Sequence, residues 1–334
     1  MSKAAELAAL IGSQTALSNR NRIINGEFQI WQRGTSTTSD GYQTADRYQG
    51  SSQNGAATMS QQSFTIGQTD VPGEPKYYYR HNQTTQATDY MPNIQHRIEG
   101  VRSLAGQRVT LSLYAKASKS LALKTYIFQH FGSGGSPSSG VVVENSPTIA
   151  TLTTSWQKVT YTFDVDSING KTIGSNGDDY LAVYLQFPMS DTYSVDLALL
   201  QLEVGEQATP FEHRSFGDEL IRCQRYFWRI SGYDSGGIQY PAGANVAFST
   251  SAAALTVIYP VPMRGKPTFT ADANTICTGV GCYNATGQSL LSTTVLAALL
   301  QINTGASSFD PEETNFSYFM GQNSNSFIAF DAEL

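Results

Sequence analysis

Short runs in which apolar and polar residues alternate are the feature that most constrains how this chain can fold. In residues 108–118, RVTLSLYAKAS, every second residue from Val109 to Ala115 is apolar, and Thr, Ser and Tyr stand between them. Residues 155–165, SWQKVTYTFDV, repeat the pattern, although Trp156 falls on the opposite parity. Successive side chains of a β-strand point to opposite faces, so each run predicts a strand with one buried face.

Further strands and turns fill the first two thirds of the chain. Residues 179–187 and 193–205 contain enough Leu and Val to form central strands. Asn-Gly pairs, which adopt positive φ at low cost, begin at residues 54, 169 and 176. Short strands separated by turn signals predict an antiparallel sandwich over residues 21–212.

A change of pattern marks the start of a second domain. Pro210 ends the last strand of the sandwich, and Ser215 followed by Asp218 is a capping signal for a short helix. Alternating or apolar segments then resume, so residues 213–334 predict a second β domain of ordinary size. The predicted fold class is all-β.

The N-terminal segment, residues 1–20, has a different character. Residues 4–11, AAELAALI, place Leu7, Leu10 and Ile11 at helical spacing in an Ala-rich run. A helix this short is marginal alone in water, so its apolar stripe predicts a partner, either another copy or a second protein. A frayed tail is the alternative interpretation.

Charge and composition exclude several classes of protein. A formal charge of -6 without a dense Lys/Arg run argues against a nucleic-acid partner. No run approaches the roughly 18 apolar residues of a spanning helix, and Glu6 interrupts the N-terminal apolar run, so neither membrane insertion nor a secretory signal is expected. Cys223, Cys277 and Cys282 fit a chain folded in a reducing cytosol, and whether the last two pair stays open.

Patterns for catalysis are sparse. Glycoside hydrolysis needs two carboxyl groups roughly 5–9.5 Å apart. Adjacent acidic pairs occur at Asp178–Asp179 and Glu312–Glu313, where turn-like surroundings favour solvated loops. The sequence contains no nucleophile elbow, Walker-type loop or HExxH motif, and its 4 histidines have no ligand spacing with cysteine. We therefore expect no catalytic residues, no cofactor and no transition-metal site.

Aromatic residues beside amides and carboxylates provide candidate sugar-binding positions. Residues 76–90, KYYYRHNQTTQATDY, supply Tyr77 and Tyr79 as candidates. The alternative interpretation of this stretch is a strand with Tyr78 inside and its two tyrosine neighbours outside.

A second candidate stretch is more loop-like and therefore better placed for contact with a ligand. Residues 229–245, RISGYDSGGIQYPAGAN, supply Tyr233, Asp234 and Tyr240. Packing of these tyrosines into the second domain or a subunit interface is the alternative.

Five motifs together resemble the virion structural proteins of tailed bacteriophages, particularly tail fibres. They are NRIINGEFQIWQRGTS, TADRYQ, LSLYAKAS, SWQKVTYTF and LALLQLEVGEQATPFEHRSFGDELIRCQRYFWR, and they span residues 21–229 in order. The resemblance implies a virion protein assembled in the host cytoplasm as a homotrimer. It implies host-surface glycan as one partner, and other virion proteins as partners of the N-terminal segment. A capsid decoration or head-fibre protein and a glycan depolymerase are the alternatives.

The first domain also resembles the jelly-roll modules that bind carbohydrate. In such modules the first and last strands are neighbours, which implies that residues 24–31 lie beside residues 196–205 and that Trp31 seals the end of the sandwich. Trp156 is expected in or near the core. These modules often hold a structural calcium, for which Glu27 and Asp196 occupy corresponding places. No other metal is expected.

Overall fold

The computed structural model describes residues 19–231, 239–272, 274–277, 282–304, 316–321 and 327–334. The chain forms two compact units, one comprising the residues up to Glu219 together with Leu334 and the other spanning Leu220–Glu333. The predicted N-terminal helix, with Leu7, Leu10 and Ile11, lies outside the described residues. Within the described ranges, no helix has the length and apolar character needed to cross a membrane.

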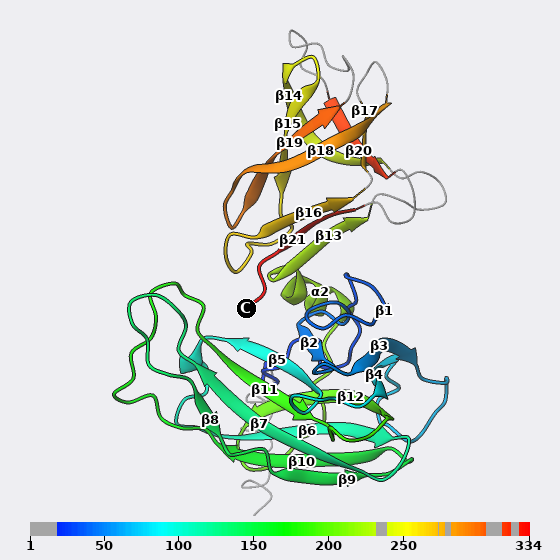
Figure 1. Ribbon diagram of the computed structural model, residues 1–334, viewed down its shortest axis with the longest axis vertical. Helices are drawn as coiled ribbons and strands as arrows, with labels where there is room; N and C mark the ends of the chain where they lie inside the picture. Colours follow the sequence, from blue (N-terminus) through cyan, green and yellow to red (C-terminus); the bar gives the residue numbers. More distant parts are fainter. Residues whose placement is uncertain (1–18, 232–238, 273, 278–281, 305–315, 322–326) are drawn as a thin grey trace, which may run out of the picture. The chain divides into compact units, whose positions relative to one another are not determined.

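The first unit is a sandwich of two six-stranded antiparallel sheets (Figure 1). The β6 sheet has the order β1 (Ser36–Thr37), β3 (Ala56–Ser63), β4 (Tyr77–Thr85), β12 (Tyr193–Val204), β6 (Arg108–Ala117), β10 (Gln157–Asp164). The β7 sheet has the order β2 (Tyr48–Ser51), β5 (Asn93–Glu99), β11 (Tyr180–Gln186), β7 (Leu121–His130), β8 (Val141–Val143). Its sixth strand, β9 (Thr148–Leu152), is also paired to β7. A short 3-10 helix, η1 (Val101–Ser103), follows β5. The predicted antiparallel jelly-roll sandwich is confirmed.

The core lies between the two sheets and follows the predicted alternation. Val109, Leu111 and Leu113 of β6 are at most 1% exposed, and Phe163 of β10 is fully buried. Each such side chain contributes roughly 1.5–3 kcal/mol by leaving water. Trp156 was expected in or near the core, but its opposite parity places it half-buried on the other side of the β6 sheet, in a smaller cluster.

The segment that precedes the first strand packs along β12. The Leu200 N–H donates to the Gly26 carbonyl and the Arg22 N–H to the Leu202 carbonyl, both at 2.8 Å. The side-chain oxygen of Asn21 accepts from the Leu202 N–H at 3.1 Å. The first and last segments of the sandwich are therefore neighbours, as the resemblance implied, but residues 24–31 form turns and irregular chain and not the expected first strand.

Trp31 is a structural residue. Its indole N–H donates to the Phe28 carbonyl at 2.5 Å. Its ring is stacked on Tyr79 with 6.2 Å between centroids, and it packs against the main core. These contacts occupy the indole from two sides, which agrees with a sealing role at the end of the sandwich.

A β-bulge interrupts the alternation in β12. The register with β6 shifts between Ala198 and Gln201, and Leu199 has a φ of 51°. Leu197 and Leu200 point into the main core, whereas Leu199 joins the cluster on the outer face of the β6 sheet. A bulge re-aims side chains in this way, and here it gives the outer face a buried apolar anchor.

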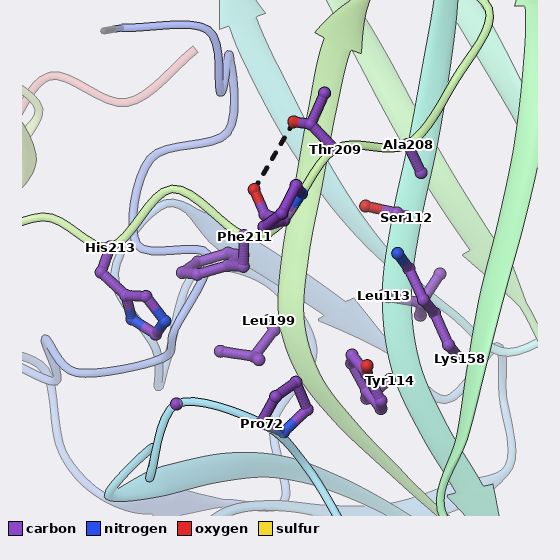
Figure 2. Close-up of a pocket in the computed structure, with 12 residues that line it drawn as sticks. Pro72, Ser112, Leu113, Tyr114, Lys158, Leu199, Ala208, Thr209, Phe211 and His213 are labelled. Atoms are coloured by element: carbon purple, nitrogen blue, oxygen red, sulfur yellow. Dashed lines mark hydrogen bonds between the residues drawn. The ribbon is translucent and has the colours of Figure 1, made fainter. Parts of the chain in front are cut away.

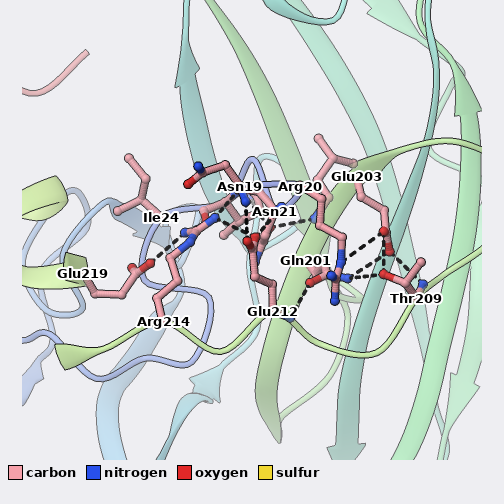
Figure 3. A network of polar contacts seen from close by, with 12 residues as sticks. Asn19, Arg20, Asn21, Ile24, Gln201, Glu203, Thr209, Glu212, Arg214 and Glu219 are labelled. Carbon is pink, nitrogen blue, oxygen red and sulfur yellow. Dashed lines mark hydrogen bonds and ion pairs between the residues drawn. The ribbon is translucent and has the colours of Figure 1, made fainter. Parts of the chain in front are cut away.

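A polar network fixes the chain that leaves β12 (Figure 3). The buried Glu203 carboxylate accepts from the Thr209 N–H at 2.8 Å and from its hydroxyl at 2.6 Å. The Glu212 N–H donates to Gln201 Oε1 at 2.8 Å. Arg20 Nε lies 3.6 Å from Glu203 Oε2. Because Glu203 and Gln201 accept hydrogen bonds from Thr209 and Glu212, this segment has one defined path over the sheet.

The predicted capping signal is confirmed at helix α2 (Phe216–Gln224). The Asp218 N–H donates to Ser215 Oγ at 3.1 Å, and Ser215 Oγ donates to the Asp218 carboxylate at 2.7 Å. The unit boundary falls inside this helix.

The second unit is also built of β-strands. A three-stranded sheet has the order β13 (Phe227–Ser231), β21 (Phe327–Asp331), β16 (Thr268–Asp272). A closed barrel has the order β14 (Gln239–Ser249), β15 (Ala252–Ile258), β19 (Ala297–Thr304), β18 (Cys282–Thr293), β17 (Asn274–Cys277), β20 (Phe316–Gly321). Phe330 lies in the core of the second unit. Its ring centroid is 4.9 Å from that of Tyr259 and 5.8 Å from that of Trp228. Cys277 and Cys282 are backbone partners across β17 and β18.

Replacing Gly26 with alanine is expected to destabilise the first unit by at least about 2 kcal/mol. A Cβ at this position would lie 2.2 Å from the Leu200 carbonyl oxygen, which itself belongs to β12. Urea unfolding of the two proteins measures the difference. Gly217→Ala in α2 is the matched control: a Cβ there meets nothing within 4 Å, so helix propensity predicts equal or up to about 1 kcal/mol greater stability. An unchanged midpoint for Gly26→Ala would contradict the close approach.

Stability should fall as the pH drops from about 6.5 to about 4. His81 is fully buried beside Gln83, and burial lowers its pKa to about 4 from 6.5. Between these values the unfolded chain binds a proton that the folded protein does not, so acid favours unfolding by up to about 1.4 kcal/mol per pH unit. Urea unfolding at several pH values should show a shallower slope for His81→Gln than for the unchanged protein. Equal slopes would show that His81 does not contribute.

Candidate functional site

Several aromatic side chains lie on the outer face of the β7 sheet. They belong to two neighbouring strands and stand at the positions that point away from the core. The register places Tyr184 of β11 between Tyr126 of β7 and Gln95 of β5. One step along, Ala182 stands between Phe128 and Arg97. We call this surface the tyrosine face, made up of Gln49, Asn93, Gln95, Arg97, Lys124, Tyr126, Phe128, His130, Tyr180, Ala182, Tyr184 and Gln186.

The aromatic rings of the tyrosine face are paired. Tyr126 and Tyr184 are stacked with 4.4 Å between centroids and 7° between planes. His130 and Tyr180 are stacked at 4.6 Å, and the Arg97 guanidinium lies 4.5 Å from the Tyr180 centroid. Burial raises the pKa of Tyr126 and of Tyr184, so both phenols stay neutral hydrogen-bond donors at physiological pH.

Polar groups fix one side of this face. Gln95 Nε2 donates to Gln49 Oε1 at 2.7 Å, and Arg97 Nη2 donates to the same oxygen at 3.1 Å. Arg97 Nε donates to Gln95 Oε1 at 3.3 Å. The arginine is thus held by two amides, and its planar group is oriented against Tyr180.

Two acceptors at the end of the face lack partners. Gln186 and Asn93 stand opposite each other in the register of β11 and β5. Among the described residues, Gln186 Oε1 and Asn93 Oδ1 are buried side-chain atoms without a hydrogen bond. Buried acceptors normally have a donor, so these positions favour a ligand hydroxyl or a water molecule.

This combination suits a sugar ring. Aromatic carbons can contact the C–H groups of a pyranose, while amides and phenols can bond its hydroxyls. The face extends over β2, β5, β11 and β7, which favours a chain of sugar residues lying across the strands over a single enclosed molecule.

The structure corrects the sequence-based choice of Tyr79. Its side chain is 1% exposed and lies in the main core, 5.7 Å from Phe28 between ring centroids, so it cannot stack on a ligand. The alternative interpretation, with Tyr78 inside and Tyr79 outside, is also wrong, because each of these two side chains points to the face opposite to the one expected. Tyr78 faces outward with Arg80, whereas Tyr77 is half-buried and its ring lies 4.9 Å from Lys76 Nζ.

The second candidate stretch falls largely outside what the structure describes. Tyr233 and Asp234 lie outside the described residues, and Tyr240 is placed only as a backbone position in β14, opposite Phe319 of β20. Their role in binding stays a prediction.

The acidic pair Asp178–Asp179 has structural partners. Asp178 accepts from the Ser133 N–H at 2.7 Å and from its hydroxyl at 2.5 Å, and these bonds hold its pKa below the ordinary value. Asp179 Oδ2 accepts from the Val101 N–H at 2.8 Å. A carboxyl group with a lowered pKa is unsuited to general acid catalysis. Glu312 and Glu313 lie outside the described residues.

Glu27 and Asp196, the candidate calcium ligands, have separate partners. Asp196 accepts from Arg80 at 2.6 and 2.8 Å and is paired with Lys116 at 3.6 Å. Glu27 accepts from Gln29 Nε2 at 2.6 Å and lies 3.3 Å from His213 Nδ1. In the described part of the chain, no group of three or more His, Cys, Asp or Glu side chains could hold a metal ion.

The sequence interpretation missed Tyr126, Tyr180 and Tyr184. Residues 179–187 were expected to form a central strand from their Leu and Val content, which is correct. The signals overlooked were Tyr126 and Phe128 at alternate positions of β7, and Tyr180 and Tyr184 on one parity of β11 with Ala182 between them. Aromatic side chains on the outward parity of a strand point to a contact surface.

No protein-family model and no curated protein sequence matches this chain. Among solved structures, it is similar to the N-terminal cellulose-binding domain of β-1,4-glucanase C from Cellulomonas fimi, with 16% identity and a TM-score of 0.32 over 53% of this chain and 98% of that one. It is also similar to a xylan-binding domain from Paenibacillus barcinonensis, with 15% identity and a TM-score of 0.32 over 55% of this chain and 94% of that one. A third similar structure is the enzymatically active domain of tailspike protein 4 of bacteriophage CBA120, with 10% identity and a TM-score of 0.34 over 56% of this chain and 22% of that one. At these values the similarities carry no information about a ligand, so the chemistry of the tyrosine face must follow from its own side chains.

Proposed function

We propose that this protein is a non-enzymatic structural protein of a tailed-phage virion, a trimeric tail fibre that binds host-surface glycan through the tyrosine face. The virion assignment is supported by the ordered motifs of residues 21–229. The N-terminal segment with Leu7, Leu10 and Ile11 is proposed to dock onto other virion proteins.

The observation that carries glycan binding is the stacked Tyr126–Tyr184 pair beside unpaired acceptors. The ring centroids are 4.4 Å apart, and the neighbouring register position holds Gln186, with its buried, unbonded oxygen. Rigid aromatic groups lose little conformational entropy on binding, and the acceptors orient the hydroxyls of the ligand.

Trimer formation is supported by apolar side chains exposed at one end of the β15 and β19 strands. Ile258 is 75% exposed and is paired in register with Ala297, next to Leu296, which is 58% exposed. Leu291 and Leu299 extend this surface. Exposed apolar groups that lie together favour a protein contact, and a trimer would multiply weak glycan affinity.

Replacing Tyr126 and Tyr184 together with alanine should weaken glycan binding at least about tenfold, since losing an aromatic anchor commonly costs about 2 kcal/mol. An array of bacterial surface polysaccharides identifies a ligand, and titration of that ligand gives the affinities. Tyr90→Ala is the matched control, because Tyr90 is 72% exposed and is not one of the residues that make up the tyrosine face.

Tyr90→Ala should bind like the unchanged protein. Equal binding by the double variant would overturn the assignment of the tyrosine face. Release of reducing ends from the bound glycan would favour the depolymerase alternative, and absence of any polysaccharide ligand would favour the decoration alternative.

Ile258→Glu combined with Leu296→Glu should convert the trimer to monomers, because burying the introduced carboxylates in an apolar contact is unfavourable. Light scattering after size-exclusion chromatography measures the mass. Ile66→Glu is the control, since Ile66 is 98% exposed in the first unit and should leave the trimer intact. A trimer that survives the double substitution contradicts this interface.

A further inference from the structure

A cavity lies in the first unit, on the outer face of the β6 sheet and therefore on the opposite side of the sandwich core from the tyrosine face. It has a volume of about 440 Å³. Figure 2 shows its wall of β6 and β10 side chains and, across from them, the chain that carries Phe211 and His213. We call it the lysine pocket, lined among others by Ser112, Tyr114, Lys158, Leu199, Phe211 and His213.

The walls of the lysine pocket are fixed by features already described. The β12 bulge turns Leu199 outward, where it is 2% exposed and packs with Tyr114 and Phe211. The backbone N–H of Glu212, next to Phe211, donates to Gln201 Oε1 at 2.8 Å. The pocket is therefore preformed, as small-molecule sites usually are.

Gly73 closes the pocket on the side of the β3–β4 connection. Its φ is 81°, and a Cβ there would lie 2.6 Å from His213 Nε2. The glycine allows the loop to pack directly on the imidazole, whose other nitrogen lies 3.3 Å from Glu27. The imidazole is thus held between the loop and a carboxylate.

One cationic side chain, that of Lys158, lines the pocket in a chain whose net charge is -6. Lys158 is exposed at the rim and, among the described residues, takes part in no salt bridge. No aspartate or glutamate is among the described residues that line the cavity. On the same sheet face, Lys116 and Arg80 share one carboxylate, that of Asp196. Two carboxylates contact lining residues, Glu27 with His213 and Glu203 with Thr209, so the charge that favours an anion is that of Lys158 at the rim.

We propose that the lysine pocket binds a sugar residue that carries a carboxylate, such as a uronic acid. Lys158 pairs with the carboxylate, and the hydroxyl of Ser112 bonds a ring hydroxyl. Tyr114 and Phe211 contact the apolar C–H groups of the pyranose. The volume falls within the roughly 300–1,000 Å³ of small-ligand sites.

The lining distinguishes this ligand from simpler anions. Tight phosphate sites use arginine forks or several backbone N–H groups. This cavity offers one lysine and a few neutral polar groups, such as the hydroxyl of Ser112, among aromatic and aliphatic side chains. A neutral sugar would leave the lysine unused. A carboxylate joined to a pyranose ring uses both the charge and the aromatic wall.

The test is a titration of the full-length protein with D-glucuronate, D-glucose and inorganic phosphate, followed by ligand-observed NMR. Glucuronate should bind more tightly than the other two. Lys158→Gln should weaken glucuronate binding about tenfold, because a hydrogen bond to a charged group is lost, and Lys158→Arg should largely retain it. Since Lys158 is exposed, neither substitution threatens folding.

Lys171→Gln is the matched control, because Lys171 is also exposed and its ammonium lies over Phe131 away from the pocket lining. It should leave the affinity unchanged. Equal binding of glucuronate and glucose, equal competition by phosphate, or an unchanged affinity in Lys158→Gln would each overturn the proposal.

The lysine pocket and the tyrosine face are tested separately. The Tyr126→Ala, Tyr184→Ala double variant should bind glucuronate like the unchanged protein, whatever becomes of its binding to polysaccharide. Loss of glucuronate binding in that variant, with Lys158→Gln unaffected, would move the acidic-sugar site to the other sheet and overturn the assignment to the lysine pocket.

Discussion

The backbone pairing of residues 21–26 with β12 is the contact on which the first unit depends. The Leu200 N–H reaches the Gly26 carbonyl at 2.8 Å, and the approach is so close that only glycine fits. Because β12 lies inside the β6 sheet between β4 and β6, this pairing joins the start of the unit to its centre. The network around Glu203 and Gln201 starts from the same strand and directs the following segment over the outer face.

The bulge in β12 contains a backbone conformation of unfavourable energy, and the same bulge shapes the lysine pocket. A non-glycine residue at positive φ costs roughly 1–3 kcal/mol, and Leu199 has a φ of 51°. Burying its side chain to 2% exposure returns about 1.5–3 kcal/mol, so the conformation is sustained. Without the extra residue, Leu199 would point into the main core and the floor of the lysine pocket would be missing. The irregular position is thus the one that creates the cavity.

The alternation of apolar and polar residues predicted the strands β6 and β10 and their core residues, because this alternation can be recognised from the local sequence alone. It could not decide Tyr77, Tyr78 and Tyr79, since three adjacent tyrosines have no apolar parity. The decisive contact is long-range: Arg80 pairs with Asp196 of β12 at 2.6 Å on the outer face, which turns Tyr79 into the core. The tyrosine face likewise depends on the register of β7 with β11, strands separated by a long connection that the sequence does not align.

The position of the two proposed sites on opposite outer faces limits how they can cooperate. Two packed sheets are separated by a core about 10 Å thick, and each face carries its own side chains beyond that. A short oligosaccharide therefore cannot touch Tyr184 and Lys158 of one copy at the same time. Any gain in affinity from using both sites must come from separate stretches of a long polymer or from several copies of the protein, where linked weak sites raise avidity.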